Sequence, residues 1–271
     1  MMKLGIFAKT FPGTDPMTVL SAAKSAGYDG VQYNMACSGL EPMPATITQA
    51  QTAAIAQAAQ TTGQKIFALS ATYNMIHPDP AIRAAGHQRL ATIAANAAAI
   101  GTNLITLCTG TRDPADQWRH HPDNTTPEAW TDLLAAFETA LQIADRHDLI
   151  LGVEPELANV VSSPATARRL IDDMQSPRIR IILDPANLFE TEPDHSDIIA
   201  RAIDLLADRI CMAHAKDRAA DGSFATAGQG VVDFPIFLRR LKSTGFTGAL
   251  VTHGLTAAEA PATARYLRGL L

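Results

Sequence analysis

Short apolar runs alternate with longer amphipathic segments along the whole chain, and this alternation restricts the fold more than any other feature. Each apolar run has the length of a buried strand, and each amphipathic segment has the length of a helix. The predicted strands are Leu4–Ala8, Gly30–Tyr33, Lys65–Leu69, Leu104–Leu107, Leu149–Val153, Ile179–Leu183, Arg209–Ala213 and Ala249–Thr252. The predicted helices are Pro16–Ala26, Thr48–Thr62, Ala81–Ile100, Pro127–His147, Pro164–Met174, His195–Ala207, Phe234–Ser243 and Ala257–Leu270. Strict alternation without hairpin signals favours an α/β fold, with a parallel sheet closed into a (β/α)8 barrel.

The length of the chain agrees with one such barrel. It has 271 residues, near the ~250 that are typical of a single (β/α)8 domain. We therefore expect one domain over residues 1–271. An open, doubly wound sheet is the alternative, but the chain contains neither a G-x-G-x-x-G nor a G-x-x-x-x-G-K-[ST] motif.

Charge and cysteine content exclude several classes of partner. The formal net charge is −5, and no run of Lys and Arg is longer than a pair, which argues against nucleic acid and membrane surfaces as partners. The sequence shows no signal peptide and no apolar stretch of about 18 residues that would span a bilayer. The chain has three cysteines, which lie far apart in the sequence and form no C-x-x-C motif. We therefore expect reduced thiols in a cytoplasmic protein.

Candidate metal ligands stand where successive apolar runs stop. Glu154, Asp184 and His214 are spaced 30 residues apart, about one strand and helix unit, which indicates equivalent positions in successive units. His253 follows the last predicted strand in the same way and is the natural fourth ligand. An Asp-Pro pair after one strand often only caps a turn, but that explanation does not predict four such residues at equivalent strand ends. Two carboxylates and one or two imidazoles without a thiolate suit one divalent ion, namely Mn²⁺, Mg²⁺, Co²⁺ or Zn²⁺.

Other polar residues lie near the same predicted strand ends, where barrel enzymes place their chemistry. Candidates for substrate binding are Asn34, Asn74, Arg112, His121, Glu156 and Asn187. Arg112 and His121 belong to a long loop that either closes over a substrate or packs on its own barrel, and Glu156 is either a binding group or a solvated charge. Gly228-Gln229-Gly230 either cradles a phosphate or only makes a turn.

Several of these segments resemble a known superfamily. The stretches are Val153-Glu154-Pro155-Glu156, Leu183-Asp184-Pro185-Ala186-Asn187, Ala213-His214-Ala215-Lys216-Asp217 and Ala227-Gly228-Gln229-Gly230. They resemble the xylose isomerase-like TIM-barrel superfamily and, within it, the sugar phosphate isomerase/epimerase group. The resemblance runs from the first strand to the last helix. It implies a TIM barrel whose metal ligands include Glu154, Asp184 and His214.

The resemblance also implies an activity. Ketose epimerases of this superfamily carry a glutamate after the last strand, as ligand and base, whereas this chain has His253. An isomerase or epimerase is expected to act on a keto-sugar, an aldose or a sugar derivative through a metal-stabilised enediolate. Glu154 would remove the proton, Lys216 would face the developing negative charge, and His253 would be a ligand or an acid and base.

Other activities stay open. The histidine at position 253, in place of a glutamate, somewhat favours a second class: a metal-dependent lyase, dehydratase or decarboxylase that acts on a keto-sugar or sugar acid. A nuclease like endonuclease IV needs more ligands than this chain supplies, Asn187 stands where one expected histidine would be, and the acidic charge disfavours DNA. A barrel that binds a sugar without catalysis is the fourth alternative. Homodimers and tetramers are common in the resembled family, so a homo-oligomer is a further expectation.

Overall fold

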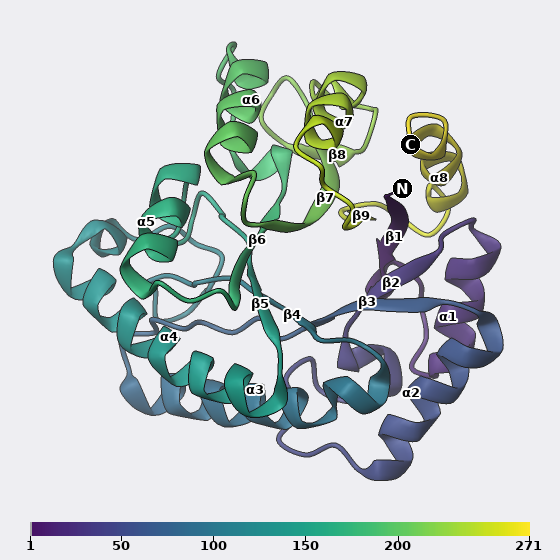
Figure 1. Ribbon diagram of the computed structural model, residues 1–271, viewed down its shortest axis with the longest axis horizontal. Coiled ribbons are helices and arrows are strands. Elements are labelled where there is room, and N and C mark those ends of the chain that lie inside the picture. Colours follow the sequence, from purple (N-terminus) through teal and green to yellow (C-terminus); the bar gives the residue numbers. More distant parts are fainter. Residues whose placement is uncertain (1) are drawn as a thin grey trace.

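The computed structural model describes residues 2–271. Parallel strands form a ring in the middle of the molecule, and helices lie around it (Figure 1). The strands of the ring are β1 (Lys3–Phe7), β2 (Gly30–Tyr33), β3 (Lys65–Ser70), β4 (Leu104–Leu107), β5 (Ile150–Val153), β6 (Ile179–Leu183), β7 (Ile210–Arg218) and β9 (Ala249–Thr252). Neighbours pair in chain order from β1 to β7, and β9 pairs with both β7 and β1, which closes the ring. The predicted (β/α)8 TIM barrel is confirmed, and the open sheet is excluded.

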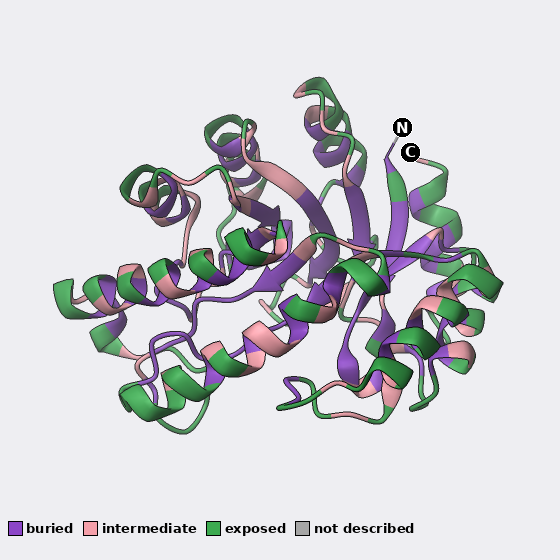
Figure 2. Cartoon of the chain, turned by 60° about the horizontal axis from the view of Figure 1, so that its bottom comes forward, coloured by how far each residue is buried: buried purple, intermediate pink, exposed green. Residues whose placement is uncertain are grey.

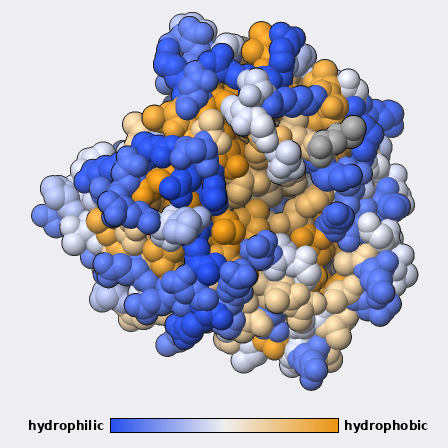
Figure 3. Space-filling model, in the orientation of Figure 1, coloured by the Kyte–Doolittle hydropathy of each residue, from blue (hydrophilic) through white to orange (hydrophobic). Residues whose placement is uncertain are grey.

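The helices follow the strands in turn. They are α1 (Pro16–Ser25), α2 (Gln49–Thr62), α3 (Pro80–Ile100), α4 (Pro127–His147), α5 (Pro164–Met174), α6 (His195–Leu206), α7 (Phe234–Ser243) and α8 (Ala260–Arg268). Their buried faces turn toward the ring, and their exposed faces turn outward (Figure 2). On the face drawn in Figure 3, hydrophilic side chains form much of the outline, and apolar side chains show more toward the middle. Among residues 2–271 no helix is long and apolar enough to cross a membrane.

The boundaries of α4 show how local sequence sets these elements. The Thr126 hydroxyl accepts a hydrogen bond from the backbone N–H of Ala129, and Pro127 occupies the first helical turn, where its missing N–H costs nothing. The helix ends at His147, and Asp148 has a left-handed backbone conformation with φ of 53°. The apolar stripe between these ends includes Phe137, which is fully buried against the barrel.

One close contact between α3 and the loop after β3 depends on a glycine. Gly86 lies inside α3, and a Cβ atom added there would stand 2.1 Å from Cδ2 of the buried Tyr73. Glycine normally weakens the interior of a helix. Here it lets the tyrosine ring lie directly against the helix backbone.

The structure corrects the sequence prediction around β7. The predicted strand ends at Ala213, but β7 continues to Arg218 because its second half pairs with β8 (Phe224–Thr226) in an antiparallel hairpin that the sequence analysis did not predict. His214 therefore lies inside a regular strand and not at its end. Four 3-10 helices were also not predicted: η1 (Ala8–Thr10), η2 (Met35–Ser38), η3 (Pro122–Thr125) and η4 (Pro185–Asn187).

Candidate functional site

Three of the predicted metal ligands converge at one end of the barrel. Glu154 directly follows β5, Asp184 directly follows β6, and His214 lies within β7. One potential ligand atom from each lies within 4.8 Å of the other two. Asp184 and His214 are each 1% exposed, whereas the side chain of Glu154 is 15% exposed. Neighbouring parallel strands thus bring together residues that lie 30 positions apart in the sequence.

Hydrogen bonds from β2 fix the orientation of the His214 ring. The Gln32 amide donates from Nε2 to Thr106 Oγ1 at 3.3 Å, which turns Gln32 Oε1 toward His214. His214 Nε2 lies 2.9 Å from this oxygen and therefore carries the proton. His214 Nδ1 then faces the carboxylates, 3.2 Å from Glu154 Oε1 and 3.7 Å from Asp184 Oδ2. A neutral imidazole in this tautomer points a lone pair into the cluster, which is the arrangement a metal ligand needs.

Asp184 presents one oxygen to the cluster without a hydrogen bond. Its Oδ1 accepts from the backbone N–H of Ala186 at 2.9 Å and caps η4. Its Oδ2 is buried and accepts no hydrogen bond from the described residues, although Lys216 Nζ lies 3.3 Å away in an ion pair. Burial opposes ionisation, but the positive charge of Lys216 holds the pKa of Asp184 well below its usual range. The site therefore holds an ionised, incompletely paired carboxylate oxygen that suits a cation.

Asn187 forms hydrogen bonds with Lys216 on one side and with Glu154 on the other. Lys216 Nζ donates to Asn187 Oδ1 at 2.6 Å, and Asn187 Nδ2 donates to Glu154 Oε1 at 2.7 Å. The carboxylates raise the pKa of Lys216 against the effect of burial. Burial likewise opposes ionisation of Glu154, but the charge of His214 lowers the pKa of this carboxyl. Glu154 Oε2 accepts no hydrogen bond from the described residues and stays available to a substrate.

His253 stands next to the cluster but outside it. Its ring stacks on His214 with 5.5 Å between centroids and an interplanar angle of 8°, and it also contacts Phe7. Burial and then the charge of His214 lower its pKa to about 4, so the imidazole is neutral at pH 7. Its Nδ1 is buried and has no hydrogen-bond partner among the described residues. The role of His253 as fourth ligand or as acid and base stays a prediction.

The donor set fits a divalent ion. Two carboxylate oxygens and one imidazole nitrogen bind such ions at about 2.0–2.2 Å, so donors on one ion are at most about 4.4 Å apart. The 4.8 Å spread of Glu154, Asp184 and His214 needs only a small contraction to reach that value. Burial lowers the pKa of His214, but the Glu154 carboxylate beside it raises the pKa to about 9. A cation in the cluster would take the place of the proton on Nδ1.

A cavity of about 490 Å³ opens above the cluster. Glu154, His214, Lys216 and His253 line it, and so do Asn34 and Glu156 from the predicted substrate-binding set. Burial and the neighbouring Glu154 raise the pKa of Glu156 to about 7. Asn187 is fully buried and does not line this cavity itself. It forms hydrogen bonds with Glu154 and Lys216, which do.

Other predicted substrate-binding residues lie outside this cavity. Asn74 donates to the backbone oxygen of Thr111 and accepts from backbone N–H groups, so it fastens two loops together. Arg112 pairs with Asp132 on α4 at 2.7 Å. His121 caps η3. All three side chains are thus engaged in contacts within the protein. Their part in substrate binding stays a prediction, and their positions outside the cavity do not favour it.

Several residues that line the cavity were not predicted from the sequence. Gln32 was not selected, although a polar residue in the middle of an apolar barrel strand is a usable signal. Phe7, Trp118 and Phe224 form apolar walls. Trp118 belongs to the long loop that the sequence offered as a cover for a substrate, whereas Phe224 gave no clear signal, because it lies in the unpredicted β7–β8 hairpin.

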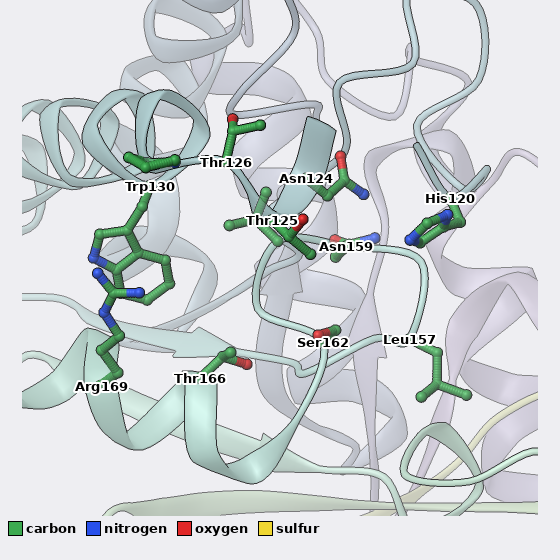
Figure 4. A pocket seen from close by; sticks show the side chains of 12 residues that line it. His120, Asn124, Thr125, Thr126, Trp130, Leu157, Asn159, Ser162, Thr166 and Arg169 are labelled. Carbon is green, nitrogen blue, oxygen red and sulfur yellow. The ribbon is translucent and has the colours of Figure 1, made fainter. Parts of the chain in front are cut away.

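A separate cavity of about 280 Å³ lies beside the N-terminal ends of α4 and α5 (Figure 4). Arg169 stacks on the Trp130 ring with its Cζ 4.0 Å from the centroid. His120 and Leu157 stand at the opposite side of the view. Glu154, Asp184 and His214 do not line this cavity, so it is not the centre of the site.

Solved structures with the same fold include sugar enzymes. A 3-keto-D-glucoside 4-epimerase from E. coli is 18% identical, with a TM-score of 0.77 over 99% of this chain and 100% of that one. A D-allulose 3-epimerase from Methylomonas sp. is 17% identical, with a TM-score of 0.76 over 100% and 98%. A probable 3-DHS dehydratase from Bacillus anthracis is 12% identical, with a TM-score of 0.78 over 98% and 99%. At these identities the likeness shows the fold alone.

The sequence itself shows the family. The comparison with curated proteins found no match. The family model of the xylose isomerase-like TIM barrel matches residues 20–270. The resemblance that the strand-end residues indicate is thereby confirmed over nearly the whole chain, and the chain belongs to the xylose isomerase-like TIM-barrel family.

Proposed function

We propose that the protein is a divalent-metal-dependent sugar isomerase or epimerase that acts on a keto-sugar, an aldose or a sugar derivative. The observation that carries the proposal is the convergence of Glu154, Asp184 and His214 in one cluster, from which Glu154 and His214 line a cavity and one carboxylate oxygen of Glu154 is left free. Structures of similar fold bear the names of sugar epimerases, which supports this class of substrate.

The cavity residues have distinct roles in this proposal. An ion held by Glu154, Asp184 and His214 would polarise the carbonyl of a keto-sugar and stabilise the charge that follows proton loss. Glu154 Oε2 takes the proton from carbon, because Oε1 accepts a hydrogen bond from Asn187 and lies 3.2 Å from His214 Nδ1, among the other ligand atoms. The Lys216 ammonium supplies a positive charge near the developing oxyanion. His253 enters as a neutral imidazole that can take up a proton, and the proton that Glu154 holds is the one available for return to carbon.

A metal-dependent lyase, dehydratase or decarboxylase is the second candidate. It shares the proton abstraction and differs in the group that leaves afterwards. The presence of His253 in place of a second carboxylate supports it, because elimination from one face needs one base and not two ionised carboxylates. One structure of similar fold is titled a probable dehydratase.

Deuterium exchange tests the proposal. The purified protein is analysed for bound metal, loaded with Mn²⁺ and incubated in D₂O with a panel of keto-sugars, and the products are followed by NMR. Deuterium in a recovered or epimerised sugar supports the isomerase, whereas loss of water or CO₂ supports the lyase. Glu154→Gln is expected to abolish exchange, and Glu138→Gln on the exposed face of α4 is the matched control. Exchange at the full rate in Glu154→Gln would remove Glu154 from the role of base.

The setting of this activity is part of the proposal. The free thiols of Cys37, Cys108 and Cys211 support a cytoplasmic location. The partner is a small sugar or sugar-derived molecule, and assembly into a homo-oligomer stays an expectation from the family.

A further inference from the structure

The cavity above the metal ligands adjoins a second one. The inner cavity, about 490 Å³, and an outer cavity of about 290 Å³ share three wall residues, Trp118, Glu156 and Phe224. The inner volume alone falls within the range of about 300–1,000 Å³ that small-molecule sites have. The outer cavity adds a second chamber at its mouth, so the two together have room for more than one sugar ring.

Two of the three shared wall residues are aromatic, and both are half exposed to solvent. Trp118 and Phe224 are 50% and 51% exposed. Phe224 is held in place because Lys216 Nζ lies 4.0 Å and Arg218 Cζ lies 4.3 Å from the centroid of its ring. Large apolar side chains that stay half exposed at the mouth of a site indicate contact with a ligand. Flat aromatic faces suit the apolar faces of a ring, and the Glu156 carboxyl, which lines the same two cavities, suits hydroxyl groups.

The loop behind the hairpin does not offer a phosphate site. The glycine-rich segment after β8 has its backbone N–H groups directed at the buried carboxylate of Asp217. Gly228 and Gly230 donate to Asp217 Oδ2 at 2.9 Å each, and Val232 donates to Oδ1 at 3.0 Å. An internal anion thus occupies the position that a phosphate would take. Of the two alternatives that the sequence leaves open for these glycines, the structure favours the turn.

The charges of the outer cavity also disfavour an anion. Glu156 and Glu190 both line it. Its guanidinium, from Arg218, already donates to the backbone oxygen of Ala186 at 2.9 Å and to that of Gly222. A phosphate in this chamber would meet the carboxyl groups of Glu156 and Glu190 and a guanidinium that is already engaged by two backbone oxygens, whereas a neutral ring meets no charge repulsion.

From these observations we infer that the substrate is a glycoside whose reacting ring carries the carbonyl group that the proposed chemistry needs. Its reacting sugar ring occupies the inner cavity beside Glu154, and its second, neutral ring lies against Trp118 and Phe224 in the outer cavity. This inference rests on the function proposed above and narrows its substrate class. The second ring is either another sugar or an aromatic group, since both present apolar faces to the two side chains.

Binding measurements on the Mn²⁺-loaded protein test the inference without any need for turnover. NMR titrations compare both anomers of methyl glucoside with both anomers of phenyl glucoside, with cellobiose and maltose, and with glucose 6-phosphate. We expect at least one two-ring ligand to bind on the order of tenfold more tightly than methyl glucoside. A preference for phenyl glucoside or for a disaccharide identifies the second ring as aromatic or sugar.

Variants show whether this preference comes from the outer cavity. We expect Trp118→Ala to bind the preferred two-ring ligand and methyl glucoside with nearly equal affinity, so that the ratio of their affinities falls close to one. Ile236→Ala, on α7 and 49% exposed, removes a similarly exposed apolar side chain away from the site and is expected to keep the ratio. Circular dichroism checks that both variants are folded.

Several outcomes would overturn the inference. Equal affinity for one-ring and two-ring ligands, tighter binding of glucose 6-phosphate, or no binding of any glycoside would each do so. Deuterium exchange into a free keto-sugar together with equal affinities would overturn the glycoside inference and leave the proposed function in place. Absence of exchange in every sugar would instead count against the proposed function, while the affinity ratio could still be measured.

Discussion

Replacement of Gln32 by leucine tests the reasoning about the metal ligands most directly. The change removes the oxygen that accepts the proton of His214 Nε2 and keeps a side chain of similar size. His214 is 1% exposed, so its N–H would be left buried and unpaired, at a cost of about 1–3 kcal/mol. Loss of a partner that orients a metal-binding histidine typically costs about 10–100-fold in metal affinity, which corresponds to about 1.4–2.7 kcal/mol. The first value is a cost to folding, so we expect the free energy of unfolding to fall by that amount, and from the second we expect the Kd for Mn²⁺ to rise by about 10–100-fold.

Calorimetric titration of the metal-free protein with Mn²⁺, in competition with a chelator of known affinity, measures this Kd. Gln64→Leu is the matched control, because Gln64 is also a buried glutamine, 4% exposed, and its amide donates to the backbone oxygen of Tyr28 at 2.7 Å. That variant loses a buried amide without touching His214 and is expected to bind Mn²⁺ as the wild type does. An unchanged Kd in Gln32→Leu, or an equal loss in both variants, would refute the reasoning.

Three further predictions concern the site and the fold. Asn187→Leu removes the amide that positions Glu154, so kcat/KM for deuterium exchange should fall by about 10–100-fold, and an unchanged value would contradict that role. Mn²⁺ at 100 times its Kd should raise the free energy of unfolding in urea by about 2.7 kcal/mol. Asp184→Asn should lose that increment, and its retention would place the ion elsewhere. Gly86→Ala should lower the free energy of unfolding by about 1–3 kcal/mol through its clash with Tyr73, whereas helix propensity alone predicts a gain, and a measured gain would show that the ring moves aside without cost.

The convergence of three ligand candidates at one end of the barrel was predictable from sequence because two regularities reinforce each other there. Apolar runs mark the strands, and the equal spacing of Glu154, Asp184 and His214 repeats the length of one strand and helix unit. Parallel neighbours in a barrel bring equivalent positions together, so the convergence of these residues follows from the fold. The spacing does not describe how each side chain turns, and for that reason Gln32 was missed.

The loops were harder to predict because polar residues there have two competing uses. Asn74, Arg112 and His121 looked like binding groups at the mouth of the barrel, but each forms hydrogen bonds or an ion pair within the loops or to α4. Short polar side chains readily bond to nearby backbone groups, and a sequence does not show which use prevails. The β7–β8 hairpin was missed for a related reason, because three residues are too few to give an alternating pattern.

The hydrogen bond between Gln32 and His214 has a consequence for folding. It joins positions 182 residues apart, one in the second strand and one in the seventh. Contacts this distant in sequence form only after the entropy of closing a very long loop has been overcome. The histidine is therefore aligned only when the second and seventh strands have been brought together across the barrel. An ion that needs this alignment is captured by the finished barrel and not by a growing or half-assembled chain.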